Sequence, residues 1–293
     1  MSDVRIRPMQ VDDVPAAERL SAEAFLDVDR RSARRSWPEP ELRATSRAAT
    51  WIARTEHVLR TDPGGCWVAE SEGEMIGFAT STVRETMWIL ATYAVRPGLQ
   101  GAGIGKPLLE AALHHGRGCL RAMLSSSSDP RAVRRYHAAG FSLHPQMFLR
   151  GRVDRSVLPV VEKVREGTTS DIDLMDSLDR RTRGAAHGVD HAFMLQHWRL
   201  LVSDSTTGSG YAYAFPEGGL ALLAADNRLT AARLLWTVLA DGPEEAGVAH
   251  LTAANQWAID VGIAARLDLH TEGYLALRAM APPTPYVHNG ALL

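Results

Sequence analysis

The sequence predicts a protein of two α/β domains, and three observations support this fold class. The chain has 293 residues, enough for two hydrophobic cores at roughly 100–200 residues per domain. Over residues 1–151, stretches with strand patterns alternate with stretches with helical patterns, which is typical of an α/β domain. A linker-like segment at 152–160 then leads into residues 160–293, where much of the first pattern returns. We therefore expect one domain over 1–151 and a second over 160–293.

The elements of the first domain follow from its hydrophobic periodicity and its turn residues. Asp12 and Asp13 precede a helical pattern, and an aspartate suits a helix N-cap. Gly140 follows a second helical pattern and suits its C-terminal end. Residues 30–43 form a basic segment broken by prolines. In chain order we expect a strand at 4–9, a helix from 14, a hairpin at 65–83 around a Ser-Glu-Gly-Glu turn, a buried strand at 87–95, a helix at 104–115, a strand at 119–126, a helix at 129–141 and a closing strand at 146–153.

Composition excludes several classes of protein. The net charge of −2 argues against nucleic-acid binding, which requires a strongly basic face. No run of about 18 apolar residues predicts a membrane span, and the charged first residues lack the apolar core of a signal peptide. Cys66 and Cys119 are too few for a disulfide framework or a zinc site. We therefore expect a cytoplasmic protein with reduced thiols and no metal, membrane or nucleic-acid partner.

The second domain reads as a degenerate copy of the first. IRPMQVDDV (6–14) aligns without gaps with VREGTTSDI (164–172), which places Arg7 on Arg165 and Asp13 on Asp171. Two later blocks share a different, common offset: 107–113 aligns with 233–239, and 126–143 aligns with 252–269. At that offset the glycine turn falls on DNRLTA, which has no glycine, and Tyr136 falls on Gly262. The alternative is that two α/β units share apolar patterns by chance.

The turn QGAGIG (100–105), followed by Lys106, is the most informative segment. Glycine amides can approach a phosphate closely, and a helix N-terminus adds a positive field. A P-loop needs Ser or Thr after the lysine, and Pro107 stands there instead. A dinucleotide fingerprint needs glycine where Lys106 stands. It also follows the first strand of its βαβ unit, whereas this turn follows a late strand. The first half of the chain is also net positive, so we expect any anionic ligand there.

With Gln100, Gly103 and Gly105 between a buried strand and a helix, the first domain resembles the GNAT superfamily of acyl-CoA-dependent N-acetyltransferases. The resemblance implies, for each domain, a mixed and mostly antiparallel central sheet flanked by helices. It also implies acetyl-CoA as co-substrate, with its pyrophosphate held by the amides of the turn. The residues expected to bind it are Val95, Arg96, Gln100, Gly101, Ala102, Gly103, Ile104, Gly105, Lys106, Asp129 and Ala132.

A second motif of the family lies downstream: Asp129, Ala132, Tyr136, Gly140 and Phe141 stand at its spacing, with Asp129 in place of the usual Asn. The resemblance implies that Tyr136 is the general acid that protonates the departing thiolate. A positioned acid typically contributes about 10²–10⁴-fold. In the family the Asn at this position often bonds the pantetheine arm, and an Asp is a poorer hydrogen-bond donor.

Other candidate site residues follow from position. The strand at 87–95 offers no carboxylate, so Glu85, just before it, is the candidate base, acting through water; His137 and His144 are further candidates. The backbone N–H of Val95 is the expected oxyanion donor. The substrate pocket is expected near Phe25, Leu26, the basic segment 30–35, Trp37 and Trp88.

Several remaining groups are predicted to be structural. Cys119 lacks an obvious His partner and is expected to be a buried thiol. Residues 125–128, a run of serines, read as a polar loop. Arg183, His187, Asp190 and His191 have a spacing conceivable for a metal, but a solvated helix terminus or loop is the favoured interpretation. The last twelve residues predict a covering strand and not a free tail.

The predicted function is transfer of an acetyl group from acetyl-CoA to a primary amine by direct attack, with Tyr136 as the acid. The acceptor is a small molecule or a peptide amine, and homo-oligomers remain open. An alternative is a protein that binds or senses acyl-CoA without turnover. A third possibility is that the tandem arrangement serves only dimer assembly.

Overall fold

The computed structural model describes residues 4–33 and 37–293. The chain divides into two compact units, unit 1 with residues 1–122 and 129–138, and unit 2 with residues 123–128 and 139–293. This division differs from the predicted first domain, 1–151, because residues 123–128 and 139–151 belong with unit 2. Within the described ranges, no helix is both long and apolar enough to cross a membrane.

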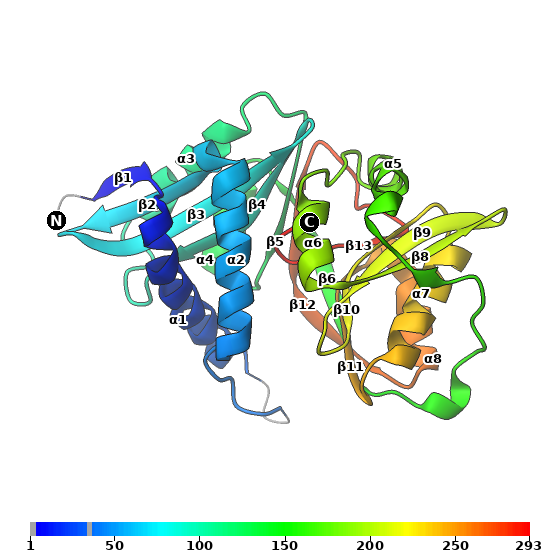
Figure 1. The fold of residues 1–293 in the computed structure, drawn as a ribbon. Helices are drawn as coiled ribbons and strands as arrows, with labels where there is room; N and C mark the ends of the chain where they lie inside the picture. Colours follow the sequence, from blue (N-terminus) through cyan, green and yellow to red (C-terminus); the bar gives the residue numbers. More distant parts are fainter. Residues whose placement is uncertain (1–3, 34–36) are drawn as a thin grey trace. The chain divides into compact units, whose positions relative to one another are not determined.

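Unit 1 contains a strand meander and its helices (Figure 1). The strands β1 to β4 follow one another in the sheet, and each pairs antiparallel with the next. The elements are β1 (Arg5–Pro8), η1 (Val11–Asp13), α1 (Val14–Ser32), α2 (Thr45–Thr61), η2 (Pro63–Gly65), β2 (Cys66–Ser71), β3 (Glu74–Arg84), β4 (Met87–Val95), α3 (Gly105–His115) and α4 (Pro130–Ala138). The predicted hairpin turn is present, with positive φ at Glu72 and Gly73.

Helices cover both faces of this meander. Gly77 of β3 lies under Leu108 of α3, whereas the next residue, Phe78, packs edge-on against Trp51 of α2, with ring centroids 5.8 Å apart. Successive strand residues point to opposite faces, so α3 and α2 lie on opposite sides of the sheet. Figure 1 shows α1 beside α2. The mixed, mostly antiparallel fold predicted from the sequence is confirmed.

Sequence reasoning assigned no element to α2. Its buried side chains include Trp51, Thr55 and Val58, which stand at helical spacing. One of these three is polar, and so is the fourth buried residue, His57, so the apolar stripe is too weak to predict a helix by hydrophobicity alone.

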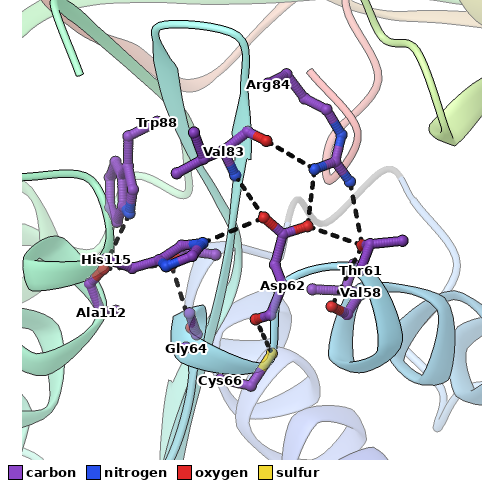
Figure 2. A network of polar contacts seen from close by, with 12 residues as sticks. Val58, Thr61, Asp62, Gly64, Cys66, Val83, Arg84, Trp88, Ala112 and His115 are labelled. Atoms are coloured by element: carbon purple, nitrogen blue, oxygen red, sulfur yellow. Dashed lines mark hydrogen bonds and ion pairs between the residues drawn. The ribbon is translucent and has the colours of Figure 1, made fainter. Parts of the chain in front are cut away.

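A buried ionic network joins the end of α2 to β3 and α3 (Figure 2). The carboxylate of Asp62 lies 2.7 Å from the guanidinium of Arg84 and 3.1 Å from Nε2 of His115, and it accepts the N–H of Val83 at 2.8 Å. Burial opposes ionisation of Asp62, but the hydrogen bond with His115 and the charge of Arg84 outweigh it and lower its pKa below 3.8. The ionised carboxylate of Asp62 therefore holds the end of α2 against β3 and α3.

We expect Asp62→Asn to destabilise unit 1 by about 3–5 kcal/mol, because Arg84 would be left as an uncompensated buried charge. Since the pKa of Asp62 is lowered by folding, its contribution is present above pH 3.8 and is lost as the pH falls through the folded value. Urea unfolding of both proteins from neutral to acid pH measures this. Asp12→Asn, at an exposed position, is the control; equal effects of the two changes would contradict the account.

Unit 2 holds two sheets. The first has the strand order β5, β12, β6, β11, and the second has the order β13, β10, β9, β8, β7. Gly210 of β9 faces Leu234 of α7, and the next residue, Tyr211, faces Asp179 of α5, so helices cover both faces of the second sheet. The elements are β5 (Arg121–Ser126), whose first two residues belong to unit 1, β6 (Ser142–Arg152), η3 (Arg155–Val157), β7 (Arg165–Glu166), η4 (Thr169–Asp171), α5 (Ile172–Thr182), α6 (Asp190–His197), β8 (Arg199–Ser205), β9 (Gly208–Ala214), β10 (Leu220–Ala225), α7 (Arg228–Asp241), β11 (Glu245–Thr252), η5 (Ala253–Asn255), α8 (Gln256–Ala264), β12 (Asp268–Arg278) and β13 (Tyr286–Val287).

The aligned segments of the two copies adopt the same local structure. Arg7 pairs with Asp13 at 2.7 Å, and their aligned partners Arg165 and Asp171 pair at 2.6 Å, each beside a short 3₁₀ helix with a capping box. The block 126–143 includes α4, and its aligned block 252–269 includes α8 at the corresponding positions. The predicted covering strand is also present, as β13, which pairs with β10. The repeat is therefore structural and not a chance match of apolar patterns.

The closing strands of the two copies pair with each other in unit 2. The alignment matches β6 with β12 and β5 with β11, yet β12 lies between β5 and β6, and β6 lies between β12 and β11. The last strand of each copy therefore pairs with strands that the repeat assigns to the other copy: β12 with β5 and β6, and β6 with β12 and β11.

A chain that ends at residue 160 is expected not to fold stably, because β6 would lose both neighbours and expose Leu149, which is now fully buried. Unpaired strand edges of this kind promote aggregation. Size-exclusion chromatography and a thermal melt of residues 1–160 test this. A soluble, cooperatively melting and fully active fragment would contradict it and would support a role of the second copy in dimer assembly alone.

Candidate active site

The glycine turn leaves β4 and leads into α3. Gly98, Gly101 and Gly103 have φ angles of 84°, 95° and 89°, in the left-handed region that favours glycine. No heavy atom lies within 4 Å of the position where a Cβ would stand on any of the three. The turn therefore presents bare backbone to open space, as a close contact with a ligand would require.

The first turn of α3 is not capped by the protein. Its N-cap residue, Ile104, makes no side-chain capping bond, and within the described part of the chain no partner is found for the amides of Gly103 or Lys106. In the second copy, by contrast, Asn227 caps α7 by accepting the N–H of Thr230 at 2.9 Å. Uncapped amides at a helix N-terminus are suited to bind anions, and this geometry is present in the first copy and not at the capped start of α7.

Gly105 is required by packing. A Cβ there would stand 2.2 Å from the hydroxyl of Tyr93 and 3.3 Å from Nε of Arg135. The Tyr93 hydroxyl instead donates to the main-chain oxygen of Gly105 at 2.8 Å. Burial raises the pKa of Tyr93 to about 12, with the charge of Arg135 acting in the opposite direction, so this hydroxyl stays protonated as a donor.

Tyr136 lies beside this junction. Its ring centroid is 6.3 Å from that of Tyr93, edge to face, and its side chain is almost fully buried. Burial is the largest cause that raises the pKa of Tyr136, and the neighbouring Tyr93 adds to it. The structure thus brings the second motif to the glycine turn, through Tyr93. Tyr93 is not among the site residues predicted from the sequence, although its place two residues before the end of β4 is a usable signal.

Asp129 acts as an anchor and not as a donor. Its carboxylate accepts the backbone N–H of Arg131 at 2.8 Å at the start of α4, and it pairs with the guanidiniums of Arg131 and Arg31 at 2.8 and 3.2 Å. The hydrogen bond from Arg131 is the main cause that lowers the pKa of Asp129 to about 2. Arg131 in turn donates to Oε1 of Gln100 at 3.4 Å. Arg131 therefore links the two motifs, a role that no sequence motif indicated.

Val95 is oriented as expected for a main-chain donor. The N–H of Arg96 bonds to the carbonyl of Ile76 in β3, so the N–H of Val95, one residue earlier, points away from β3. Just upstream, the register between β3 and β4 shifts, and Ala91 is the extra residue of a bulge. The bulge turns Tyr93 towards α3, the side on which the glycine turn lies.

The other predicted binding residues differ in what they contribute. Arg96 donates to the carbonyl of Met75 at 2.5 Å, so its guanidinium is committed to the start of β3. Lys106 is exposed and lies 3.9 Å from Glu110. Ala102 uses its amide inside the turn, Ile104 is buried in the core, and Ala132 is half-buried on α4.

The prediction of Glu85 as the base is not supported by its position. Glu85 occupies the exposed turn between β3 and β4, with φ of 53°. The strand from Met87, at the start of β4, to Tyr93 spans roughly 20 Å at 3.3 Å per residue, and Glu85 lies beyond its first residue. A carboxylate at that distance cannot serve the reaction at Tyr136, even through a water molecule. Of the alternatives, His137 is exposed on α4, and His144 lies on β6 beside Ser142.

The expected pocket residues are dispersed. Trp88 is fully buried, and its indole N–H donates to the carbonyl of Ala112 in α3, so it is a core residue and not a pocket wall. Phe25 is exposed at 41%, and Leu26 and Trp37 are half-buried. Residues 34–35 of the basic segment lie outside the described residues.

The remaining sequence candidates are placed as follows. Cys66 is buried, which raises the pKa of its thiol to about 12, and Cys119 is half-buried and not fully buried as expected. Neither Cys66 nor Cys119 forms a disulfide. In the serine run, Ser125 donates to Gln146 at 3.3 Å. The solvated interpretation of residues 183–191 is wrong, because Arg183, His187, Asp190 and His191 are all buried.

Comparison with known proteins agrees with this geometry. Residues 22–141, which include the glycine turn and Tyr136, match the acetyltransferase (GNAT) family model. This segment is a GNAT acetyltransferase domain. A mycothiol acetyltransferase of Streptomyces avermitilis is 41% identical over 88 residues, which cover 28% of this chain and 29% of that protein. One from Thermomonospora curvata is 32% identical over 134 residues, 44% of this chain and 41% of that protein. The chain thus matches less than half the length of these relatives.

Similarity to solved structures extends over both copies. A candidate acetyltransferase of Pyrococcus horikoshii superposes with a TM-score of 0.75 at 17% identity, covering 99% of this chain and 95% of that one. A tandem GNAT protein from the clavulanic acid biosynthesis pathway gives a TM-score of 0.57 at 13% identity, covering 95% and 99%. At these identities the likeness shows the fold: the GNAT domain is part of a tandem arrangement.

Proposed function

We infer that the protein transfers an acetyl group from acetyl-CoA to a primary amine, with the first copy as the working domain. The observation that carries this inference is the meeting of two motifs at one point: Tyr93 bonds Gly105 of the glycine turn and packs on Tyr136 of α4. The uncapped amides of the turn would hold the pyrophosphate of acetyl-CoA. Arg131 and Arg135 lie on the α4 side of the turn and add positive charge.

The chain's own residues supply two functions in the reaction. The amine nitrogen attacks the thioester carbonyl carbon, the carbon–sulfur bond breaks, and the phenol of Tyr136 gives its proton to the departing sulfur. The raised pKa of Tyr136 keeps the phenol in the protonated form that this step needs. The N–H of Val95 would stabilise the oxyanion of the tetrahedral intermediate. The amine loses its proton to water.

The acceptor class proposed is a small-molecule primary amine. The support is the name of the relatives, mycothiol acetyltransferases, whose matched segments are 32–41% identical to this chain. A peptide amine is the second candidate.

The competing function is acyl-CoA binding without turnover. One observation favours it. Glu85, the general base predicted from the sequence, lies far from Tyr136 and cannot deprotonate the amine there. Thiol release from acetyl-CoA, measured with a panel of small-molecule and peptide amines, separates the two functions. Amine-dependent release supports the transferase; CoA binding with no release in any amine supports the sensor.

A further inference from the structure

Unit 2 contains a buried cluster of two carboxylates and two imidazoles that the proposed transferase site does not use. Asp176 and Asp179 stand three residues apart on α5; His187 precedes α6, and His191 lies in its first turn. We name these four residues the Asp–His cluster. The side chains of Asp179, His187 and His191 are 0% exposed, and that of Asp176 is 17% exposed.

The distances within the Asp–His cluster suit a single small cation. One ligand atom each from Asp179, His187 and His191 lie within 4.8 Å of one another. Nε2 of His191 lies 3.3 Å from Oδ1 of Asp176 and 3.4 Å from Oδ2 of Asp179. Tetrahedral zinc with bonds of 2.0–2.1 Å has ligand atoms about 3.3 Å apart, which matches both. Nδ1 of His187 is closer, 2.7 Å from Oδ2 of Asp179, and would have to move by about half an ångström.

A second layer of groups fixes how the ligand atoms are presented. Without an ion, Nδ1 of His187 donates to Oδ2 of Asp179 at 2.7 Å. With an ion bound, the ring hydrogen would instead stand on Nε2, 3.2 Å from the main-chain carbonyl of Leu292, and leave Nδ1 with a lone pair. The hydroxyl of Tyr213 lies 3.2 Å from Nδ1 of His191 and can accept from it, which frees Nε2. Tyr211 donates to Oδ1 of Asp179 at 2.5 Å. Partners of this kind orient histidines that bind metals.

The cluster is left unsatisfied by the protein alone. Despite its two carboxylate neighbours, Nε2 of His191 has no hydrogen-bond partner among the described residues, and it is fully buried. Oδ2 of Asp179 accepts from Nδ1 of His187. With the hydrogen of His191 on Nδ1, however, the lone pair of its Nε2 meets the lone pairs of that same oxygen, 3.4 Å away. Buried polar groups without partners are costly. A cation among these atoms would remove the conflict.

The charged groups in and beside the Asp–His cluster carry more negative than positive charge. Asp176 and Asp179 offer two carboxylates, and the neighbouring Arg183 supplies one guanidinium, which donates to a main-chain oxygen of Leu293. A divalent ion would therefore meet an excess of carboxylate.

We propose that the Asp–His cluster is a structural binding site for a divalent transition-metal ion, Zn²⁺ by ligand type, that joins α5 to α6 in unit 2. Imidazole and carboxylate ligands at tetrahedral spacing are typical of zinc. The four protein ligands leave no open position, so the ion would stabilise the fold and take no part in acetyl transfer. A metal site here departs from the metal-free protein expected from the sequence.

The test uses the full-length chain, stripped with a chelator and titrated with Zn²⁺ and separately with Co²⁺. We expect one equivalent of zinc per chain, a raised melting temperature, and a Co²⁺ absorption spectrum of tetrahedral nitrogen and oxygen ligation. Asp176→Asn keeps an oxygen that can accept the N–H of Gly188, and His191→Gln removes a ligand. Because outer-layer partners alone alter affinity by about 10–100-fold, we expect His191→Gln to weaken zinc binding by about 100-fold or more.

One control variant and one fallback measurement make the result decisive. His197→Gln alters a partly exposed histidine on the same helix, α6, and should leave zinc binding unchanged. If both cluster variants fail to fold, the wild-type Co²⁺ spectrum still decides. Wild-type protein that binds no zinc, or an octahedral Co²⁺ spectrum, would overturn the proposal and leave a shared proton as the cation. Equal zinc binding by wild type and a folded His191→Gln would overturn it as well.

Discussion

Replacing Tyr136 by phenylalanine is expected to lower kcat for acetyl transfer by about 10²–10⁴-fold, the range for loss of a positioned general acid. The ring remains, so packing against Tyr93 and the fold should be preserved. The KM for acetyl-CoA should change little, because the phenol acts on the leaving sulfur and not on the pyrophosphate. Steady-state thiol release with the best amine of the panel measures both constants.

Arg134→Gln is the matched control for this change, since Arg134 is exposed on the same helix, α4, two residues earlier. Activity of Tyr136→Phe within about twofold of wild type would remove Tyr136 from the acid role, because the expected loss is 10²-fold or more. In that case the prediction of the glycine turn could still hold, whereas the prediction of Tyr136 as the general acid would be wrong.

Gly103→Asp is expected to weaken binding of acetyl-CoA by about 100-fold or more. Gly103 has φ of 89° in the uncapped start of α3. Aspartate tolerates this conformation better than most residues, so the fold should survive. Its carboxylate would stand beside amides proposed to hold a pyrophosphate, and each charge-assisted hydrogen bond displaced costs about 1.5–3 kcal/mol. Calorimetric titration with CoA measures the change.

Two controls isolate the charge. Gly103→Asn has nearly the same shape and the same tolerance of positive φ, so it should weaken binding much less than Asp. Leu229→Asp places the same carboxylate at the aligned, exposed position of the second copy, where Asn227 already caps the helix, and should have no effect. Equal losses for Asp and Asn would show that strain, and not anion binding, explains the result.

Much of the fold could be predicted from local sequence. The strand at 87–95 and the hairpin before it follow from apolar runs around a Glu-Gly turn, and both are present as predicted. The repeat was visible because Arg7 and Asp13 perform a structural task, the pairing beside a 3₁₀ helix, that Arg165 and Asp171 repeat. Residues whose contacts are close in sequence, such as Arg7 and Asp13, can be recognised from the sequence alone.

The parts that failed depend on contacts distant in sequence. Trp88 looked available for substrate because a tryptophan on a strand has no local sign of which face it occupies; α3 covers it. Glu85 directly precedes β4 in the sequence, but it lies at the opposite end of this strand from Tyr93. Arg131 has a role only because α4 approaches Gln100.

The prediction that residues 183–191 are solvated was wrong for a similar reason. Polar composition around residues 183–191 predicts solvent exposure, and only the packing of α5 and α6 on β9 reveals that these groups are buried. Burial of polar side chains by tertiary packing cannot be read from their own sequence.

Amine-dependent release of free thiol from acetyl-CoA by the full-length protein, compared between wild type, Tyr136→Phe and Gly103→Asp, is the most direct test of the central claim. We expect release by wild type that requires an amine, a loss in kcat for Tyr136→Phe, and a rise in KM for acetyl-CoA for Gly103→Asp. CoA binding by wild type that depends on Gly103, together with no thiol release in any amine, would contradict the transferase and identify an acyl-CoA sensor.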